Sequence, residues 1–392
     1  MMITKRLLDV CDFQGGTQPP KEEWINDPRE GYVRMLQIRD YSQGDAKFIQ
    51  YVKDTKKLHK CKKDDIMLSR YGYIGQAFMG LEGAYNVALV KVIKKEEIHT
   101  PYLLYYFQSY YFQHFLLSNV GARATIPGFN KDELENALIR LPEMREQVEI
   151  ASKIAKVDEL IGYHKQQLDI LDTLIKSRFI EMFGNLEVND KNWKQLPLGK
   201  VCDQVKRYPT FCNMEYIQSG IRVIRIGNIL LDGHMDTNDE NYVFVYEAAN
   251  RDYPDTVIEK DDIIMAVRGD GSAAKRIGII TEQKLIGANI SPNLIRIKAN
   301  NSLLVPRFLF YYLTGNVGQT RLDAYVNKTA KKNIAAKDIV KVLTPVPPID
   351  LQKEFVEFVE QTDKSKFYII HTQKIIELLF RAIQYITKEV LS

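Results

Sequence analysis

The fold is decided by one stretch, LPEMREQVEIASKIAKVDELIGYHKQQLDILDTLIKSRFIEMFG, which runs from Leu141 to Gly184. Positions 154, 157, 161, 164, 168, 171, 175, 178 and 182 alternate by three and four, and they carry Ile, Val, Ile, His, Leu, Leu, Ile, Arg and Met. Such a stripe is typical of a coiled-coil seam, with His164 as a polar, register-setting residue. Pro142 precedes the helix and Gly184 stops it. We predict one helix of about 40 residues, roughly 60 Å long.

The same pattern occurs again near the end of the chain, in VPPIDLQKEFVEFVEQTDKSK from Val346. An offset of 205 residues places Pro142 on Pro347 and Gln147 on Gln352. The same offset gives a second seam at Val359, Thr362, Lys366, Ile369, Gln373, Ile376, Phe380, Ile383 and Thr387. One long helix would expose its apolar stripe, whereas two in one chain can bury their stripes against each other. We therefore predict an antiparallel coiled coil, with an ordinary helical hairpin as the alternative.

Further segments recur in the same order, so the whole chain is predicted to be a duplication. The pairs are PYLLYYF (101–107) with PRFLFYY (306–312), DDI (64–66) with DDI (261–263), VRMLQIRD (33–40) with IRVIRIGN (221–228), and VCD (10–12) with VCD (201–203). Short β-type runs between Gly and Asn/Asp clusters fill each repeat. The predicted α+β fold has two mixed α/β bodies at 1–141 and 185–346, followed by the helices 142–184 and 347–392. Antiparallel pairing would place the bodies at opposite ends of a rod.

Composition limits the classes of function. The chain of 392 residues is 45% hydrophobic and 27% charged, which predicts two or three folded domains. No apolar run predicts a membrane span, and the N-terminus does not resemble a signal peptide. Four cysteines without C-x-x-C spacing indicate reduced thiols in the cytoplasm rather than a zinc site. The net charge of +4 is compatible with an anionic partner.

The sequence contains no catalytic motif that we recognise. Neither QPPKEE (18–23) nor VPPID (346–350) matches the N-P-P-Y type of motif that an amino-methyltransferase needs. GDGSAA (269–274) ends in Ala where a dinucleotide-binding loop has its third Gly. In PDTVIEK (254–260) Glu259 and Lys260 are adjacent, so on a strand they would point to opposite faces instead of sharing a nuclease site. We predict no catalytic residue, metal or cofactor on this chain.

The repeated segments resemble the specificity subunits of type I restriction-modification enzymes. The long stretch at 141–184 and its repeat at 346–386 are similar to the two conserved helices of that family. The bodies resemble its target-recognition domains through four stretches: DDIMLSRYGYIG (64–75), VGARATIPGFNKDEL (120–134), DDIIMAVRGDGSAAKRIG (261–278) and VNKTAKKNIAAKDIV (326–340). The resemblance covers nearly the whole chain.

This resemblance implies a non-catalytic subunit in which each body reads one half of a bipartite site in double-stranded DNA. The helices would set the gap between half-sites and dock two methyltransferase subunits. S-adenosylmethionine, ATP and magnesium would be bound by partner subunits, and whether restriction subunits also join is left open. Because the loops of the two bodies differ, the full site is expected to be asymmetric.

Residues suited to DNA contact occur in three loops that recur in both bodies: the first loop at 14–18 and 206–208, the second at 70–73 and 268–276, and the third at 123–131 and 327–332. Arg suits guanine, Asn and Gln suit adenine, and Lys and Arg suit phosphates. The candidates in the first body are Gln14, Thr17, Gln18, Arg70, Tyr71, Tyr73, Arg123, Thr125, Asn130 and Lys131. The candidates in the second body are Lys206, Arg207, Tyr208, Arg268, Ser272, Lys275, Arg276, Asn327, Lys328, Lys331 and Lys332. For each of them, a solvated side chain is the alternative.

Other interpretations stay open at this point. The lysine-rich run KDTKKLHKCKK (53–63) has no matching run in the second body, and we interpret it as a solvated turn. The aromatic residues at 102–115 are interpreted mostly as helix-spaced core. Two rival functions remain: an assembly adaptor whose bodies bind no nucleic acid, and an enzyme with an unrecognised site.

Overall fold

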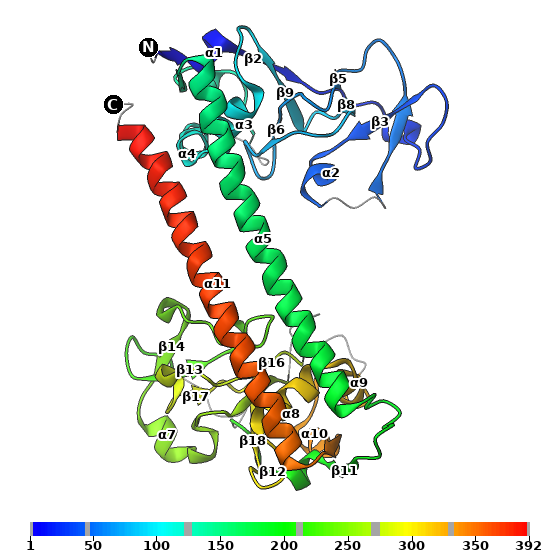
Figure 1. Ribbon diagram of the computed structural model, residues 1–392, viewed down its shortest axis with the longest axis vertical. Helices are drawn as coiled ribbons and strands as arrows, with labels where there is room; N and C mark the ends of the chain where they lie inside the picture. The colour runs from blue at the N-terminus through cyan, green and yellow to red at the C-terminus, as the bar shows by residue number, and fades with distance from the viewer. Residues whose placement is uncertain are drawn as a thin grey trace. The chain divides into compact units, whose positions relative to one another are not determined.

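The computed structural model describes residues 3–43, 48–120, 128–208, 215–267, 275–327 and 333–389, with side chains up to residue 378 (Figure 1). The chain divides into two compact units, Met1–Gln167 with Ile369–Ser392, and Leu168–Tyr368. Each unit therefore combines one body with part of both long helices. The boundaries predicted from the sequence, which separate bodies from helices, stay a prediction.

The first body is built from two four-stranded sheets and a two-stranded one. The sheets have the orders β2-β9-β6-β7, β4-β3-β8-β5 and β1-β10. Their strands are β1 (Ile3–Arg6), β2 (Cys11–Gly15), β3 (Tyr32–Leu36), β4 (Tyr51–Lys53), β5 (Lys60–Cys61), β6 (Met67–Ser69), β7 (Ala77–Phe78), β8 (Gly83–Tyr85), β9 (Leu89–Lys94) and β10 (Leu138–Leu141). The helices are α1 (Leu7–Val10), α2 (Ile38–Ser42), α3 (Thr100–Gln108) and α4 (Tyr110–Asn119), with 3-10 turns η1 (Lys21–Glu23) and η3 (Asp132–Leu134).

The second body repeats this order of strands, except that no described strand corresponds to β5, so one of its sheets has three strands instead of four. Its sheets are β12-β18-β15-β16, β14-β13-β17 and β11-β19. The strands are β11 (Lys194–Pro197), β12 (Cys202–Arg207), β13 (Ile221–Ile224), β14 (Val243–Val245), β15 (Ile263–Ala266), β16 (Ile277–Ile279), β17 (Asn289–Ile290), β18 (Leu294–Ala299) and β19 (Leu343–Val346). The helices are α6 (Leu198–Val201), α7 (Ala248–Asp252), α8 (Pro306–Thr314), α9 (Asn316–Asp323) and α10 (Ala336–Ile339), with 3-10 turns η4 (Ile226–Asn228), η5 (Asp239–Asn241), η6 (Pro254–Thr256) and η8 (Gln283–Leu285).

The duplication extends to single hydrogen bonds. Between α3 and α4 the side-chain amide of Gln113 donates to the carbonyl of Phe107 (2.7 Å), and between α8 and α9 that of Gln319 donates to Leu313 (2.8 Å). Each amide satisfies a carbonyl that the break between two helices leaves without its helical partner. The prediction of two mixed α/β bodies is thus confirmed.

The aromatic helix α3–α4 belongs to the core of the first body. Leu103, Phe107, Phe112 and Leu116 are fully buried there. The rings of Phe107 and Phe112 meet edge to face at 4.9 Å, a favourable geometry for aromatic pairs. The interpretation of residues 102–115 as mostly core is confirmed, and Tyr110 is the exposed exception.

The long helices α5 (Met144–Phe183) and α11 (Ile349–Glu389) follow the predicted seams. All nine seam residues of α5, and the six of α11 whose side chains are described, are buried or half-buried. Within the second unit, Asp172 forms an ion pair with Lys366, and Arg178 pairs with Glu354 (2.9 Å). Because the partner number falls as the α5 number rises, these segments run antiparallel. No helix in the described ranges is long and apolar enough to cross a membrane.

The end of α5 is fixed by three side-chain contacts and a glycine. The ammonium group of Lys191 donates to the carbonyls of Glu181 and Met182 (both 3.0 Å), and the indole of Trp193 donates to Phe183 (2.8 Å). These are last-turn carbonyls that the helix itself cannot satisfy. Gly184 has a φ of 75°, the left-handed conformation that commonly ends a helix, so the predicted stop is confirmed.

The repeated Pro-to-Gln motif now has a physical explanation. Gln147 is 4% exposed; its amide accepts from the backbone N–H of His99 (3.0 Å) and donates to the carbonyl of Pro142 (2.9 Å). Gln352 is fully buried and accepts from Val305 (2.9 Å) while donating to the carbonyl of Pro347 (2.8 Å). His99 and Val305 are the N-cap residues of α3 and α8. In both units one amide therefore joins the start of a long helix to the start of the aromatic helix.

We expect Gln352→Met to lower the free energy of unfolding by about 2–4 kcal/mol, because it keeps the side-chain volume but leaves buried backbone groups without partners. Urea unfolding measured by far-UV circular dichroism tests this. Gln361→Met, at an exposed position of the same helix, is the control and should change stability by under about 0.5 kcal/mol. Equal effects of the two substitutions would contradict the role of this amide.

Candidate nucleic-acid interface

The loop after β6 is a rigid turn that presents an aromatic ring. The Ser69 hydroxyl donates to the carbonyl of Tyr73 and accepts from the backbone N–H of Gln76 (2.9 Å). Gly72 and Gly75 have φ values of 73° and 77°, and a Cβ at Gly75 would collide with Leu116. The turn therefore holds its shape while the side chain of Tyr73 is 78% exposed.

Arg70 connects this turn to the third loop of the first body. Its Nε donates to the carbonyl of Phe129 (3.1 Å), and its Nη2 donates to the side-chain oxygen of Asn130. The guanidinium also lies 5.3 Å from the ring centre of Tyr71. Tyr71 in turn forms a backbone bridge with Gly128, where a Cβ would collide with its ring. The second and third loops therefore form one surface.

The first loop of the first body lies against the same elements. The backbone N–H of Thr17 donates to the carbonyl of Tyr85 (3.0 Å), and the side chain of Gln14 accepts from the Tyr85 hydroxyl (3.0 Å). Lys131 of the third loop pairs with Asp12 in β2 and lowers the pKa of that carboxyl below its usual range. Gln18 is exposed. Among the described candidates of the first body, Gln14 lies in β2 rather than in a loop, and the others lie on three loops that contact one another or share strand neighbours.

Strand register identifies the equivalent positions in the second body. Gln14 lies opposite Lys91, and Lys206 lies opposite Arg296. Since Lys91 and Arg296 occupy matching places beside the two Asp-Asp-Ile segments, Lys206 is equivalent to Gln14 and Arg207 to Gly15. Strand pairing therefore supports the match between Lys206 and Arg207 and the first loop of the first body.

The side chains of this segment have local partners. Lys206 forms an ion pair with Asp255 (2.9 Å), and Nε of Arg207 donates to the carbonyl of Pro292 (2.8 Å). Tyr208 is 4% exposed and packs against Tyr253, with ring centres 4.6 Å apart. This placement corrects the choice of Tyr208 as a surface residue: its ring is part of the core, and we leave it out of the interface.

The second and third loops of the second body also lie together. The backbone N–H of Ile334 donates to the carbonyl of Val267 (3.1 Å), which joins the two loop ends. Lys275 pairs with Asp323 (2.6 Å), Arg276 donates to the carbonyl of Ile229 (3.2 Å), and the Asn327 side chain accepts from Asn333 (2.9 Å). The remaining candidates lie outside the described residues: Arg123, Thr125, Arg268, Ser272, Lys328, Lys331 and Lys332.

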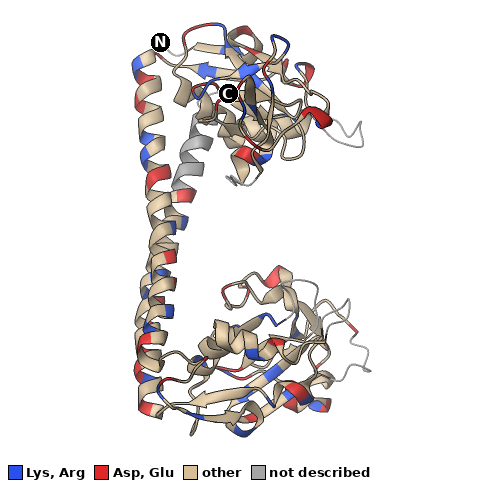
Figure 2. Cartoon of the chain, turned by 90° about the vertical axis from the view of Figure 1, so that its right-hand side faces the viewer, with Lys and Arg blue, Asp and Glu red and all other residues tan. Residues whose placement is uncertain are grey.

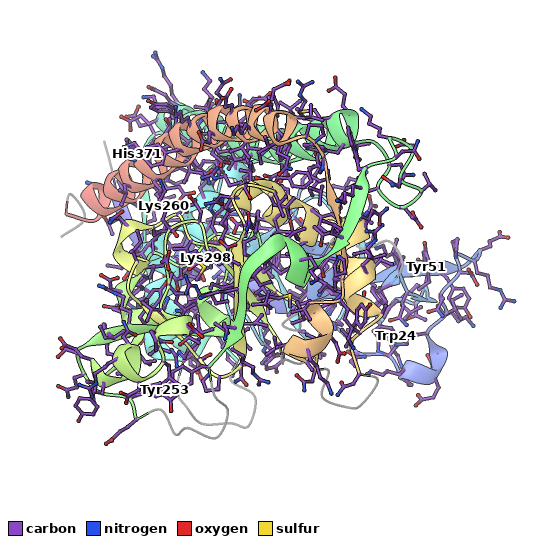
Figure 3. The ribbon with its side chains drawn as sticks, turned by 90° about the horizontal axis from the view of Figure 1, so that it is seen from below. Trp24, Tyr51, Tyr253, Lys260, Lys298 and His371 are labelled. Carbon is purple, nitrogen blue, oxygen red and sulfur yellow. The ribbon has the colours of Figure 1, made fainter. Side chains whose placement is uncertain are left out.

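An ion network with a buried Arg–Asp pair at its centre lies between β15 and β18 of the second body, and sequence reasoning missed it. Arg296 is 2% exposed; its Nε contacts Asp262 (2.6 Å) and its Nη2 contacts Glu259 (2.9 Å). Lys298, labelled in Figure 3 together with Lys260, pairs with the other oxygen of Glu259 (2.7 Å). Lys298 and Arg296 lower the pKa of Glu259, whereas burial raises the pKa of Asp262.

The first body has the same pair in weaker form, between Lys91 and Asp65 at 3.4 Å. The sequence signal that could have predicted this ion pair is a basic residue on the strand paired with each Asp-Asp-Ile segment, Lys91 in the first body and Arg296 in the second. The carboxylate of Glu259 is held by Lys298 and Arg296, and Glu259 and Lys260 lie in the connection between η6 and β15 rather than on a strand as the sequence argument assumed.

The family model of the type I restriction modification DNA specificity domain matches residues 2–172 and 190–379. The chain belongs to this specificity family. The two matched ranges agree with the duplication seen in the strands. Family membership identifies the chain as a specificity subunit rather than as a catalytic one.

Named relatives share this family. The MjaVIII specificity subunit of Methanocaldococcus jannaschii is 24% identical over 374 residues, which cover 91% of this chain and 85% of the relative. The EcoBI specificity subunit of Escherichia coli is 24% identical over 371 residues, covering 87% and 75%. The similarity extends over both bodies and both helices.

Solved structures show the same fold. A structure from work on assembly and conformational transition of the type I restriction-modification system covers 98% of this chain and 96% of its own, with a TM-score of 0.60 at 16% identity. The specificity subunit from M. genitalium covers 98% and 95%, with a TM-score of 0.53 at 15% identity. The fold of two recognition domains and two long helices is thus that of known specificity subunits.

We expect Arg296→Met to lower the free energy of unfolding at pH 7 by about 3–5 kcal/mol, because it leaves Asp262 as an unpaired buried carboxylate. Burial raises the pKa of Asp262 and Arg296 lowers it, so removal of Arg296 should raise this pKa further, and the carboxyl of the variant should take up a proton at a higher pH than that of the parent. The loss should therefore shrink as the pH falls from 7 towards about 4. Urea unfolding of variant and parent at several pH values measures this.

Arg296→Lys is the matched control, because it reproduces the Lys91–Asp65 arrangement of the first body and should cost less stability. A destabilisation by Arg296→Met that stays constant with pH would mean that Asp262 is not the group left unpaired.

Proposed function

We propose that the chain is the DNA-specificity subunit of a type I restriction-modification complex, in which each body reads one half of a bipartite duplex site. The observation that carries this proposal is the set of joined loops in the first body, with described residues of the second body at equivalent strand positions. Loops placed on a rigid scaffold are where recognition residues commonly lie. Family membership supports DNA as the ligand, and the contacts among the loops support their choice as the binding surface.

Differences at equivalent positions support an asymmetric site. Gln14 and Gly15 of the first body correspond to Lys206 and Arg207 of the second. An amide can pair with adenine, whereas Lys and Arg donors favour guanine or phosphate. The two bodies therefore offer different donor and acceptor sets, and we expect them to read different half-sites.

Arg70 is the strongest candidate for a direct base contact. Two of its N–H groups are used by Phe129 and Asn130, and Tyr71 supports the guanidinium plane. A guanidinium carries five N–H donors, so several remain for a ligand. Because the side chain is already held in place, binding would cost little rotamer entropy.

Protein partners would bind the long helices. Exposed apolar side chains on α5 include Ile170 and Ile180, and those on α11 include Phe367 and Tyr368. Apolar side chains in this number on outward helix faces are typical of protein contacts. We propose that methyltransferase subunits dock there and carry S-adenosylmethionine, with ATP and magnesium on restriction subunits where these are present, all in the cytoplasm.

We expect Arg70→Gln to weaken binding of the full chain to its preferred duplex by about 1–3 kcal/mol, and to relax the preference at one base pair. Duplexes selected from a random library, followed by titrations at low and high salt, measure both effects. Arg145→Gln, at an exposed position of α5, is the control. A uniform loss over all sequences would make Arg70 a phosphate contact. Absence of DNA binding by the parent chain at every salt concentration would favour the assembly adaptor instead.

The helices are proposed to set the gap between the half-sites. One heptad inserted within residues 154–182 alone should strain or shift the pair and change the tolerated gap. Matched heptads in both helices lengthen the pair by about 10.5 Å, or about three base pairs at 3.4 Å each. Sequencing of methylated sites in a host that carries the variant complex measures the gap. A soluble, active variant with an unchanged gap would contradict the spacer role.

A further inference from the structure

The lysine run, defined as Lys53–Lys63, has an ordered backbone rather than that of a loose turn. It begins at the end of β4, passes through a turn closed by the Leu58 N–H and the Thr55 carbonyl (3.2 Å), and includes β5. Cys61 is buried and Leu58 packs on a small apolar cluster. The lysine side chains are all exposed: Lys53, Lys56, Lys57, Lys60, Lys62 and Lys63. The fold therefore displays six ammonium groups on one ordered segment.

Most of this charge is not neutralised locally. Within the described part of the chain, the ion pair recorded for the run is Lys60 with Asp54 (2.5 Å). The neighbouring carboxylate of Asp65 pairs with Lys91, outside the run, and accepts from the backbone of Lys62. Asp64 is exposed beside the run. Four ammonium groups are thus exposed to solvent, those of Lys56, Lys57, Lys62 and Lys63. In the described part of the chain, Asp64 is the neighbouring carboxylate for which no ion pair is seen.

The run is attached directly to the first loop of the proposed DNA surface. Nδ1 of His59 lies 2.6 Å from the carbonyl oxygen of Gly15, and a carbonyl only accepts, so Nδ1 donates. The backbone N–H of His59 donates to the hydroxyl of Thr17 (3.4 Å). Lys91, which lies opposite Gln14, donates to the carbonyl of Lys60 (2.9 Å). The run and the first loop are therefore one continuous surface.

The equivalent segment of the second body has the opposite charge. Between β4 and β6 the first body holds five Lys and three Asp, in residues 54–66. Between β14 and β15 the second body holds six Asp or Glu and two Lys or Arg, in residues 246–262. Figure 2 shows basic and acidic residues in contrasting colours over both bodies.

We propose that the lysine run binds the phosphate backbone of duplex DNA beside the half-site that the first body reads. This inference rests on the proposed function. Lysine ammonium groups neutralise phosphates without reading bases and release condensed counterions, which makes binding salt-dependent. The first body thus supplies a sequence-independent contact with DNA phosphates, whereas the acidic segment of the second body does not.

The test uses the full chain with Lys56, Lys57, Lys62 and Lys63 changed together to Gln. The slope of log binding constant against log salt should fall by about 0.9 for each lysine that contacts a phosphate, so by about 2 to 4 in total. The preferred bases should not change. Arginine at the same four positions should restore the slope.

A matched variant controls for net charge, because it removes four exposed lysines from the long helices: Lys156, Lys165, Lys176 and Lys364. It should keep the parent slope. Shortening the duplex on each flank in turn locates the contact: removal of one flank should weaken the parent chain and leave the lysine-run variant unchanged.

An unchanged slope in the lysine-run variant, or an equal loss in the helix control, would overturn the proposal. Loss of methyltransferase assembly with an unchanged slope would also overturn it and make the run a protein contact. If the parent chain itself shows no salt-dependent DNA binding, the proposed function fails, and that outcome is separate from the others.

Discussion

The structure depends on one kind of buried contact, the side-chain amide that closes the start of each long helix. Gln147 and Gln352 each bond to a carbonyl of their own helix entry and to an N–H at the start of an aromatic helix. Buried backbone groups are costly when unpaired, so this amide constrains how a body joins its helix. A recognition surface is useful only if the body that carries it is held firmly, and this contact provides the attachment in both units.

The two bodies share the contacts of their scaffold but differ in the sequences of their loops. Gln113 and Gln319 make the same bond at the same break, and the basic residue opposite each Asp-Asp-Ile segment forms the same ion pair. Loss of one partner leaves the other without its hydrogen bond or counter-charge, which is most costly where the pair is buried, as at Arg296 and Asp262. Side chains at the partly exposed ends of β2 and β12 carry no such constraint, so the position of Gln14 in the first body is occupied by Lys206 in the second. This separation allows one architecture to present two different reading surfaces.

The described loops resemble a site built for binding more than one built for reaction. Arg70 is held by hydrogen bonds and by an aromatic ring, which fixes the direction of its remaining donors. Specificity in such a site comes from base edges and affinity largely from phosphates. The contrast between the lysine run and the acidic segment of the second body suggests that the two bodies divide these tasks unequally. A site of this kind is consistent with membership of the specificity family.

The sequence by itself determined the long helices, their seams, their ends and the order of the repeated elements, because periodicity, proline and glycine act over a few residues. It also indicated which loops recur. Only the tertiary structure decided which contacts the side chains of those loops make. The partners of Arg70 lie 59 and 60 residues away, and Tyr208 is buried against a ring in another element. The hydrogen bond between the side chain of Gln147 and the backbone N–H of His99 joins residues 48 positions apart. Hydrogen bonds and burial depend on groups that meet only after folding, so no local pattern reveals them.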